Sequence, residues 1–238
     1  MKKFLAIITA CLSFIGDSVY CAGIDDLRFS IANGEAVVID CNPNAAGSLD
    51  IPAEYLGNPV TEIGTDAFAR CDFLTSVTVP ETVRSVGVAA FLNCDLLQRI
   101  SLPDSLSSIG SRAFNFCISL TSVNIPSGVT VIESSTFGTC RSLARITIPS
   151  SVRSVNYRAF YGCDSLAVLY FRGAAPEQVD LEAFEIPGVF PSKRAYVQSE
   201  HLESFGGRGN TWYGLIVDVL DADGDGISSM FNKNLIIL

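Results

Sequence analysis

Three aspartates near the C-terminus have a spacing that could bind a metal ion. Asp221, Asp223 and Asp225 occupy alternate positions in the stretch "LDADGDGIS", and Gly226 permits a sharp turn directly after them. Calcium takes six to eight oxygen ligands, and a D-x-D-x-D-G spacing supplies about half of such a shell. Calcium is therefore the one cofactor that the sequence suggests.

This aspartate motif resembles the beginning of EF-hand and thrombospondin type 3 calcium loops. In an EF-hand the twelfth position, here Asn232, carries a bidentate acid, and the sequence has no acid there. A calcium loop and a solvated acidic linker are both open interpretations of residues 221–238, and the missing ligand favours the linker.

Five cysteines recur at intervals of 23 residues and could bind metal, form disulfides or pack in a core. Zinc needs ligands that converge on one point, whereas a regular repeat spreads its members along a line. Disulfides suit an oxidising compartment, but five equivalent thiols cannot all pair with one another. Packing is favoured, because free cysteine behaves as a small apolar residue. The repeated residues are Cys71, Cys94, Cys117, Cys140 and Cys163.

Catalytic groups are scarce in the sequence. The single histidine, His201, lies outside the repeats, and no Ser-His-Asp or Cys-His grouping can be assembled around it. No G-x-x-x-x-G-K-[ST] loop for phosphate and no G-x-S-x-G nucleophile motif is present. The sequence predicts that the protein is not an enzyme.

The N-terminus has the features of a secretory signal. Residues 1–21 begin with Lys2 and Lys3, and an apolar run follows that is too short to span a bilayer. The sequence therefore predicts a secreted or cell-surface protein that does not insert into a membrane after cleavage. Lipid anchoring through Cys11 is the less favoured alternative, because the apolar region before it is too short.

The remaining residues are acidic on balance. Without residues 1–21 the chain has 14 basic and 24 acidic side chains, a net charge of −10. Such a charge repels nucleic acid on average, so no nucleic-acid partner is expected.

The elements that must position these residues follow from an internal repeat. Residues 60–171 align with themselves at a period of 23, and periods between 20 and 50 indicate stacked supersecondary units. Each unit contains L-x-x-[VIL]-x-[VILF]-P, in which Val77 and Val79 alternate with Thr78 as in a strand with one buried face. The sequence predicts a repeat solenoid with one short strand per coil, mostly β and turns with little helix. The repeated aromatic residues are Phe68, Phe91, Phe114, Phe137 and Phe160.

The repeat resembles the BspA-like leucine-rich repeat of bacterial surface and secreted proteins, with the pattern I-G-x-x-A-F-x-x-C-x-x-L-x-x-I-x-I-P. Arg172 stands where that pattern has proline, and Glu133 and Asn156 replace its glycine, so the turns there are open to question. The predicted domains are a signal peptide at 1–21, an N-terminal cap at 22–59, repeats at 60–184, a C-terminal cap at 185–220 and an acidic tail at 221–238. Five repeats are regular, and a sixth, at "PEQVDLEAF", is degraded.

A solenoid binds its partners on the faces that the repeat leaves free. The outward strand positions form a polar strip that carries two arginines, which suit carboxylate or sulfate groups. We therefore expect a non-enzymatic binding or adhesion module for an extracellular protein or acidic glycan, as the resemblance also implies. A structural scaffold, organised by calcium at its C-terminus, is the alternative. The expected ligand-binding residues are Ser76, Thr78, Arg99, Ser101, Ser122, Asn124, Arg145, Thr147 and Tyr170.

Overall fold

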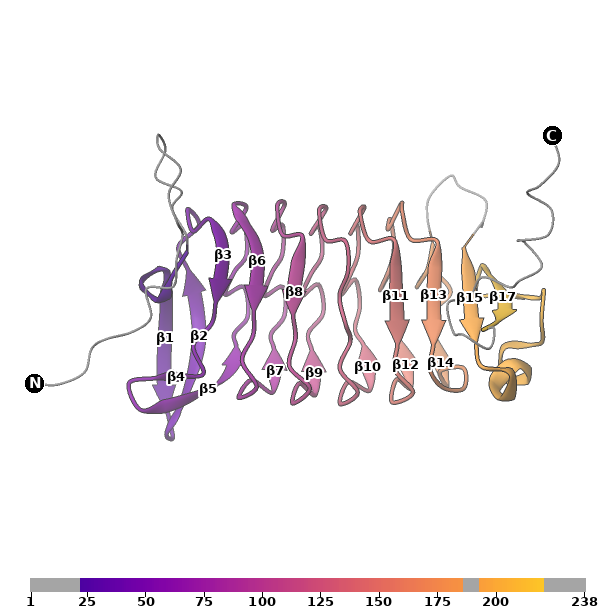
Figure 1. Ribbon diagram of the computed structural model, residues 1–238, viewed down its shortest axis with the longest axis horizontal. Coiled ribbons are helices and arrows are strands. Elements are labelled where there is room, and N and C mark those ends of the chain that lie inside the picture. The colour runs from indigo at the N-terminus through magenta and orange to yellow at the C-terminus, as the bar shows by residue number, and fades with distance from the viewer. Residues whose placement is uncertain (1–21, 186–192, 221–238) are drawn as a thin grey trace, which may run out of the picture.

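The protein is a β-solenoid of about eight turns, elongated along the axis on which its coils stack (Figure 1). The structure is a computed structural model that describes residues 22–185 and 193–220. The predicted signal peptide and the aspartates of the calcium motif lie outside these residues. Within them, no helix has both the length and the apolar character needed to cross a membrane.

All but one of the regular coils have a first strand at the predicted position, and each has a second strand of two residues. The first strands pair in parallel from coil to coil, and residues 122–124 join two sheets through the isolated bridges Arg99–Ser122 and Asn124–Thr147. The first strands are β3 (Gly47–Asp50), β6 (Leu74–Thr78), β8 (Arg99–Ser101), β11 (Arg145–Ile148) and β13 (Val168–Phe171).

The second strands form at the apolar pair that follows the proline of each repeat. The sequence predicts only the first strand, and the second adds a parallel ladder on another face of the same coil (Figure 1). A ladder of this kind satisfies backbone groups that would otherwise be left without partners. The second strands are β7 (Ser85–Val86), β9 (Ser108–Ile109), β10 (Val131–Ile132), β12 (Ser154–Val155) and β14 (Gln178–Val179).

Both ends of the described solenoid carry elements that interrupt the repeat. At the N-terminal end a 3₁₀ turn (η1, Ile24–Asp26) precedes the antiparallel pair β1 (Leu27–Ala32) and β2 (Glu35–Cys41). Strand β5 (Asn58–Ile63) then pairs with β4 (Glu54–Tyr55) and leads into the second-strand ladder through β7. The C-terminal elements are β15 (Arg194–Val197), η2 (Ser199–Phe205), β16 (Thr211–Trp212) and β17 (Leu215–Val219).

The repeated phenylalanines form one continuous stack along the core. From Phe91 to Phe184, neighbouring ring centroids are 5.4–5.5 Å apart and nearly parallel. Phe184 belongs to the degraded sixth unit, and its place in the stack confirms that this unit keeps the register. Since none of these rings is more than 4% exposed, the stack forms the centre of the hydrophobic core.

The repeated cysteines are buried free thiols, which confirms that they pack in the core. In four coils the thiol donates a hydrogen bond to the phenylalanine carbonyl of the preceding coil. For example, Cys117 Sγ lies 3.1 Å from the Phe91 oxygen, and Cys140 Sγ lies 3.1 Å from the Phe114 oxygen. Each of these four thiols therefore fills space beside the phenylalanine stack. In three of the four coils it also becomes a second donor to a carbonyl that already accepts a backbone N–H within its own coil, as the Phe114 oxygen accepts from Cys117 at 3.2 Å.

The glycine of the repeat is needed because neighbouring coils approach closely at this position. A Cβ added to Gly87 would lie 2.6 Å from the Gly64 carbonyl carbon, and one on Gly110 would lie 2.7 Å from that of Gly87. Two coils after Gly110 the equivalent position is occupied by Asn156, whose side-chain amide donates to the carboxylate of Glu133 at 2.9 Å. The turn of each repeat contains two residues with a positive φ. One of these positive φ values recurs at Ser135 in the coil of Glu133, so the turn there is kept although its glycine is replaced.

The replacement of the repeat's proline by Arg172 also has a structural reason. The Arg172 backbone N–H donates to the Ile148 carbonyl at 3.0 Å, a bond that proline could not make. The ladder between β11 and β13 therefore runs one bond further than the ladders that end at proline.

Candidate ligand-binding surface

The outward side chains of the first strands align in two rows along the solenoid, here called the strand strip. The pairing of β6 with β8 places Ser76 beside Arg99 and Thr78 beside Ser101. The pairing of β11 with β13 places Thr147 beside Tyr170. The residues between them, such as Val77 and Ile146, are buried, so the alternation predicted from the sequence is confirmed.

A shallow groove of about 540 Å³ runs across the middle of the strand strip. Its walls include seven of the nine residues expected from the sequence to bind a ligand, whereas Ser76 and Thr78 lie one coil beyond it. These seven are Arg99, Ser101, Ser122, Asn124, Arg145, Thr147 and Tyr170.

The two arginines of this groove differ from most others in the protein. Arg99 and Arg145 are exposed and form no ion pair with any residue that the structure describes. By contrast, Arg84 lies 3.5 Å from Glu35, and Arg141 lies 3.6 Å from Asp164. The guanidinium groups of Arg99 and Arg145 therefore have N–H donors available for a ligand.

The strand strip continues beyond the residues found from the sequence. Strand β15 pairs with β13, so that Tyr196 stacks on Tyr170 with ring centroids 5.7 Å apart, and Arg194 lies beside Val168. These residues come 26 positions after their partners instead of 23, so an alignment at the regular period does not find them. The sequence indicates this additional strand only through the alternation of apolar and polar residues in "AYV".

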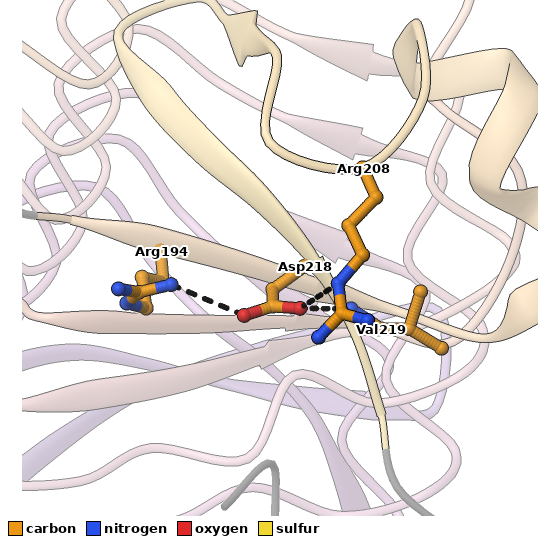
Figure 2. Close-up of polar contacts among 4 residues, drawn as sticks. All are labelled: Arg194, Arg208, Asp218 and Val219. Carbon is orange, nitrogen blue, oxygen red and sulfur yellow. Dashed lines mark hydrogen bonds and ion pairs between the residues drawn. The ribbon is translucent and has the colours of Figure 1, made fainter. Parts of the chain in front are cut away.

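A network of charged residues closes the C-terminal end of the strip. Figure 2 shows Asp218 of β17 between two arginines, with Arg194 Nη1 at 3.1 Å and Arg208 Nε at 2.9 Å. The Asp218 carboxylate also accepts the backbone N–H of Val219 at 2.9 Å. One carboxylate compensates only one of these two arginines, whereas Arg99 and Arg145 have no carboxylate partner among the described residues, so they carry the unpaired positive charge in the middle of the strip.

The other residues whose side chains could take part in catalysis or metal binding lie away from the strand strip. His201 is in η2, partly buried, with Nε2 3.8 Å from a Glu200 carboxylate oxygen. In residues 22–185 and 193–220, no group of three or more His, Cys, Asp or Glu side chains is placed to hold a metal ion. Calcium binding by Asp221, Asp223 and Asp225 stays a prediction.

Two solved structures of bacterial proteins share this fold. A leucine-rich repeat protein of T. pallidum superposes with a TM-score of 0.58 at 26% identity, over 71% of this chain and 87% of its own. The pneumococcal vaccine antigen PcpA gives a TM-score of 0.63 at 21% identity, over 82% of this chain and 48% of its own. This second likeness concerns the fold alone.

A cell-surface leucine-rich protein of Faecalibacterium prausnitzii also matches, with a TM-score of 0.53 at 24% identity, over 88% of this chain and 60% of its own. No protein of curated function matches the sequence significantly. The sequence profile of the BspA type leucine rich repeat region matches residues 56–185 in six copies, which is more than half of the chain. The protein therefore belongs to the BspA-type leucine-rich repeat family.

Proposed function

We propose that the protein is an exported, non-enzymatic binding module, and that its strand strip recognises carboxylate or sulfate groups on an extracellular protein or glycan. The predicted signal peptide supports export. The absence of a recognisable catalytic grouping in the sequence supports a binding role.

The observation that carries this proposal is a pair of arginines in one groove that form no ion pair within the described part of the chain. Arg99 and Arg145 project from first strands two coils apart, and Ser122 and Asn124 lie on the coil between them. Arginine binds carboxylate and sulfate through two parallel N–H donors, and such charge-assisted bonds are stronger than neutral ones. The hydroxyl and amide groups between the arginines can bond to neutral parts of the same ligand.

We expect the double substitution Arg99→Ala and Arg145→Ala to weaken ligand binding by at least about tenfold, because it removes two charge-assisted contacts, each of about 1.5–3 kcal/mol. The ligand would first be found by screening the purified protein on arrays of matrix proteins, sulfated glycans and uronic-acid glycans. Affinities of wild type and variant would then be compared by calorimetry.

The matched control is the double substitution Arg84→Ala and Arg141→Ala. It changes the net charge by the same amount, but its arginines lie outside the strip and pair with Glu35 and Asp164. Equal losses in both double variants would mean that only the overall charge matters. Screens with no hit at all would instead favour the scaffold alternative.

A further inference from the structure

A second hollow, of about 560 Å³, lies at the C-terminal end of the second strands. It shares no residue with the strand strip, and its volume falls within the range of about 300–1,000 Å³ that is typical of small-molecule sites. Its walls include Ser134, Asn156, Tyr157, Gln178, Asp180 and Tyr213.

The polar wall of this hollow is formed at the position where the earlier coils of the repeat have glycine and the later coils have polar residues. The glycine position of the repeat holds Gly64, Gly87 and Gly110 in successive coils. In the next two coils the same position holds Glu133 and Asn156, and in the last coil, whose register is shifted, it holds Asp180. These side chains are held in place by contacts of their own. The Asn156 amide donates to Glu133 and accepts from the Ser154 hydroxyl at 2.7 Å, and Asp180 accepts the Glu182 backbone N–H at 3.0 Å.

Strand β14 contributes further hydrogen-bonding groups, because it is the edge strand of the β10–β12–β14 sheet. An edge strand presents backbone N–H and C=O groups that no neighbouring strand pairs. The Gln178 side chain on this strand is exposed and adds an amide donor and acceptor. The floor and wall of the hollow can therefore bond to several hydroxyl groups at once.

Two tyrosine rings border the hollow, one from the solenoid and one from the C-terminal hairpin. Tyr213 stands at the tip of the β16–β17 hairpin with a φ of +47°, an uncommon conformation for a bulky side chain, and Gly214 follows at +80°. Both rings are partly exposed, Tyr157 at 42% and Tyr213 at 39%, and the Arg158 guanidinium lies over one face of Tyr157, 4.8 Å from the ring centroid.

The charge around the hollow excludes an anionic ligand. Arg158 is occupied by Glu182 at 2.8 Å, and Arg153 by Glu177 at 3.7 Å. Among the described residues, Glu133 and Asp180 form no ion pair with an arginine, so the local charge is negative. A ligand here has to be uncharged or basic, which is the opposite of what the strand strip favours.

We propose that this hollow binds a neutral oligosaccharide. The slightly positive C–H face of a pyranose ring suits the negative π face of a tyrosine. Its hydroxyl groups suit the carboxylate of Asp180, the amides of Asn156 and Gln178 and the edge of β14. The site is independent of the strand strip, so either can fail without the other.

The test is calorimetric titration of the purified protein with three neutral probes: cellohexaose, maltohexaose and chitohexaose. We expect at least one to bind, and Tyr213→Asn to weaken that binding at least tenfold. Asparagine is well tolerated in this kind of turn, so the hairpin is kept while the ring is lost. Tyr157→Ala should weaken binding similarly, whereas Tyr170→Ala, on the strand strip, is the matched control and should have no effect.

Two results would overturn the proposal. One is that none of the three oligosaccharides binds to the wild-type protein. The other is that a bound oligosaccharide keeps its affinity in both Tyr213→Asn and Tyr157→Ala, provided that circular dichroism shows both variants folded.

Discussion

Raising the pH from 7 to 10 is expected to lower the free energy of unfolding by about 4–5 kcal/mol, a large fraction of the stability of a typical domain. The cause is the buried row of thiols. Burial raises the pKa of Cys117 and Cys140, and it raises that of Cys163 to about 12. The pKa values of Cys41 and Cys94 are raised mainly by hydrogen bonding to a neighbouring thiol, and further by burial.

The direction follows from where the protons are bound. Above pH 9 the unfolded chain loses thiol protons while the folded protein keeps them, so stability is complete below pH 9 and falls as the pH rises. At pH 10 each thiol costs about 1–2 kcal/mol, and the five together cost about 7 kcal/mol.

Lys193 opposes this loss. Its ammonium donates to the Phe184 carbonyl at 2.9 Å, and burial lowers its pKa from the ordinary 10.5 to about 8. The unfolded chain therefore binds the extra proton between pH 8 and 10.5, and stability from this group rises with pH in that window. We estimate an offset of about 2–3 kcal/mol at pH 10.

Urea unfolding at pH 7 and pH 10, with a reductant present, measures the net effect. Lys193→Met should make the loss steeper, near 7 kcal/mol, because the opposing group is gone. Cys117→Ala should make the loss of stability smaller by about 1–2 kcal/mol. Stability that does not change between the two pH values would contradict a core of buried, ionisable thiols.

Replacing Phe114 by alanine is expected to destabilise the protein by about 4 kcal/mol, the cost typical of a large cavity in a core. Phe114 is fully buried, and its ring lies between those of Phe91 and Phe137 at 5.4 and 5.5 Å. In a solenoid each coil is stabilised by its neighbours, so a central cavity weakens two interfaces.

The matched variant is Phe114→Leu, which keeps most of the volume and should cost about 1 kcal/mol. Urea unfolding followed by circular dichroism compares both variants with wild type. A loss below 1 kcal/mol in the alanine variant would show that the stack of rings is not a main source of stability.

Much of the fold could be predicted from the sequence because it is periodic. Phe114, Cys117 and Leu120 recur at fixed spacing, and in a stacked fold equal spacing means equal position. The strand strip followed from the same logic, since alternation within one strand assigns the outward residue in every coil.

The remaining features arise where periodicity fails. Tyr196 stacks on Tyr170 across an interval of 26 residues, so the C-terminal part of the strip could not be assigned from a period of 23. Asn156 and Glu133 looked like defects in a turn, and only the fold shows that they bond to each other at 2.9 Å. Nothing in the sequence placed Tyr213 near Tyr157, because a hairpin outside the repeats brings it there.

Hydroxyl-radical footprinting of the tyrosines, with and without the ligand found by array screening, tests the binding role of the strand strip most directly. Tyr170 and Tyr196 lie on the strip, whereas Tyr157 and Tyr213 border the other hollow. A ligand on the strip should protect Tyr170 and Tyr196 from oxidation and leave Tyr157 and Tyr213 unchanged. Unchanged oxidation of Tyr170 and Tyr196 with saturating ligand would contradict a binding site on the strip.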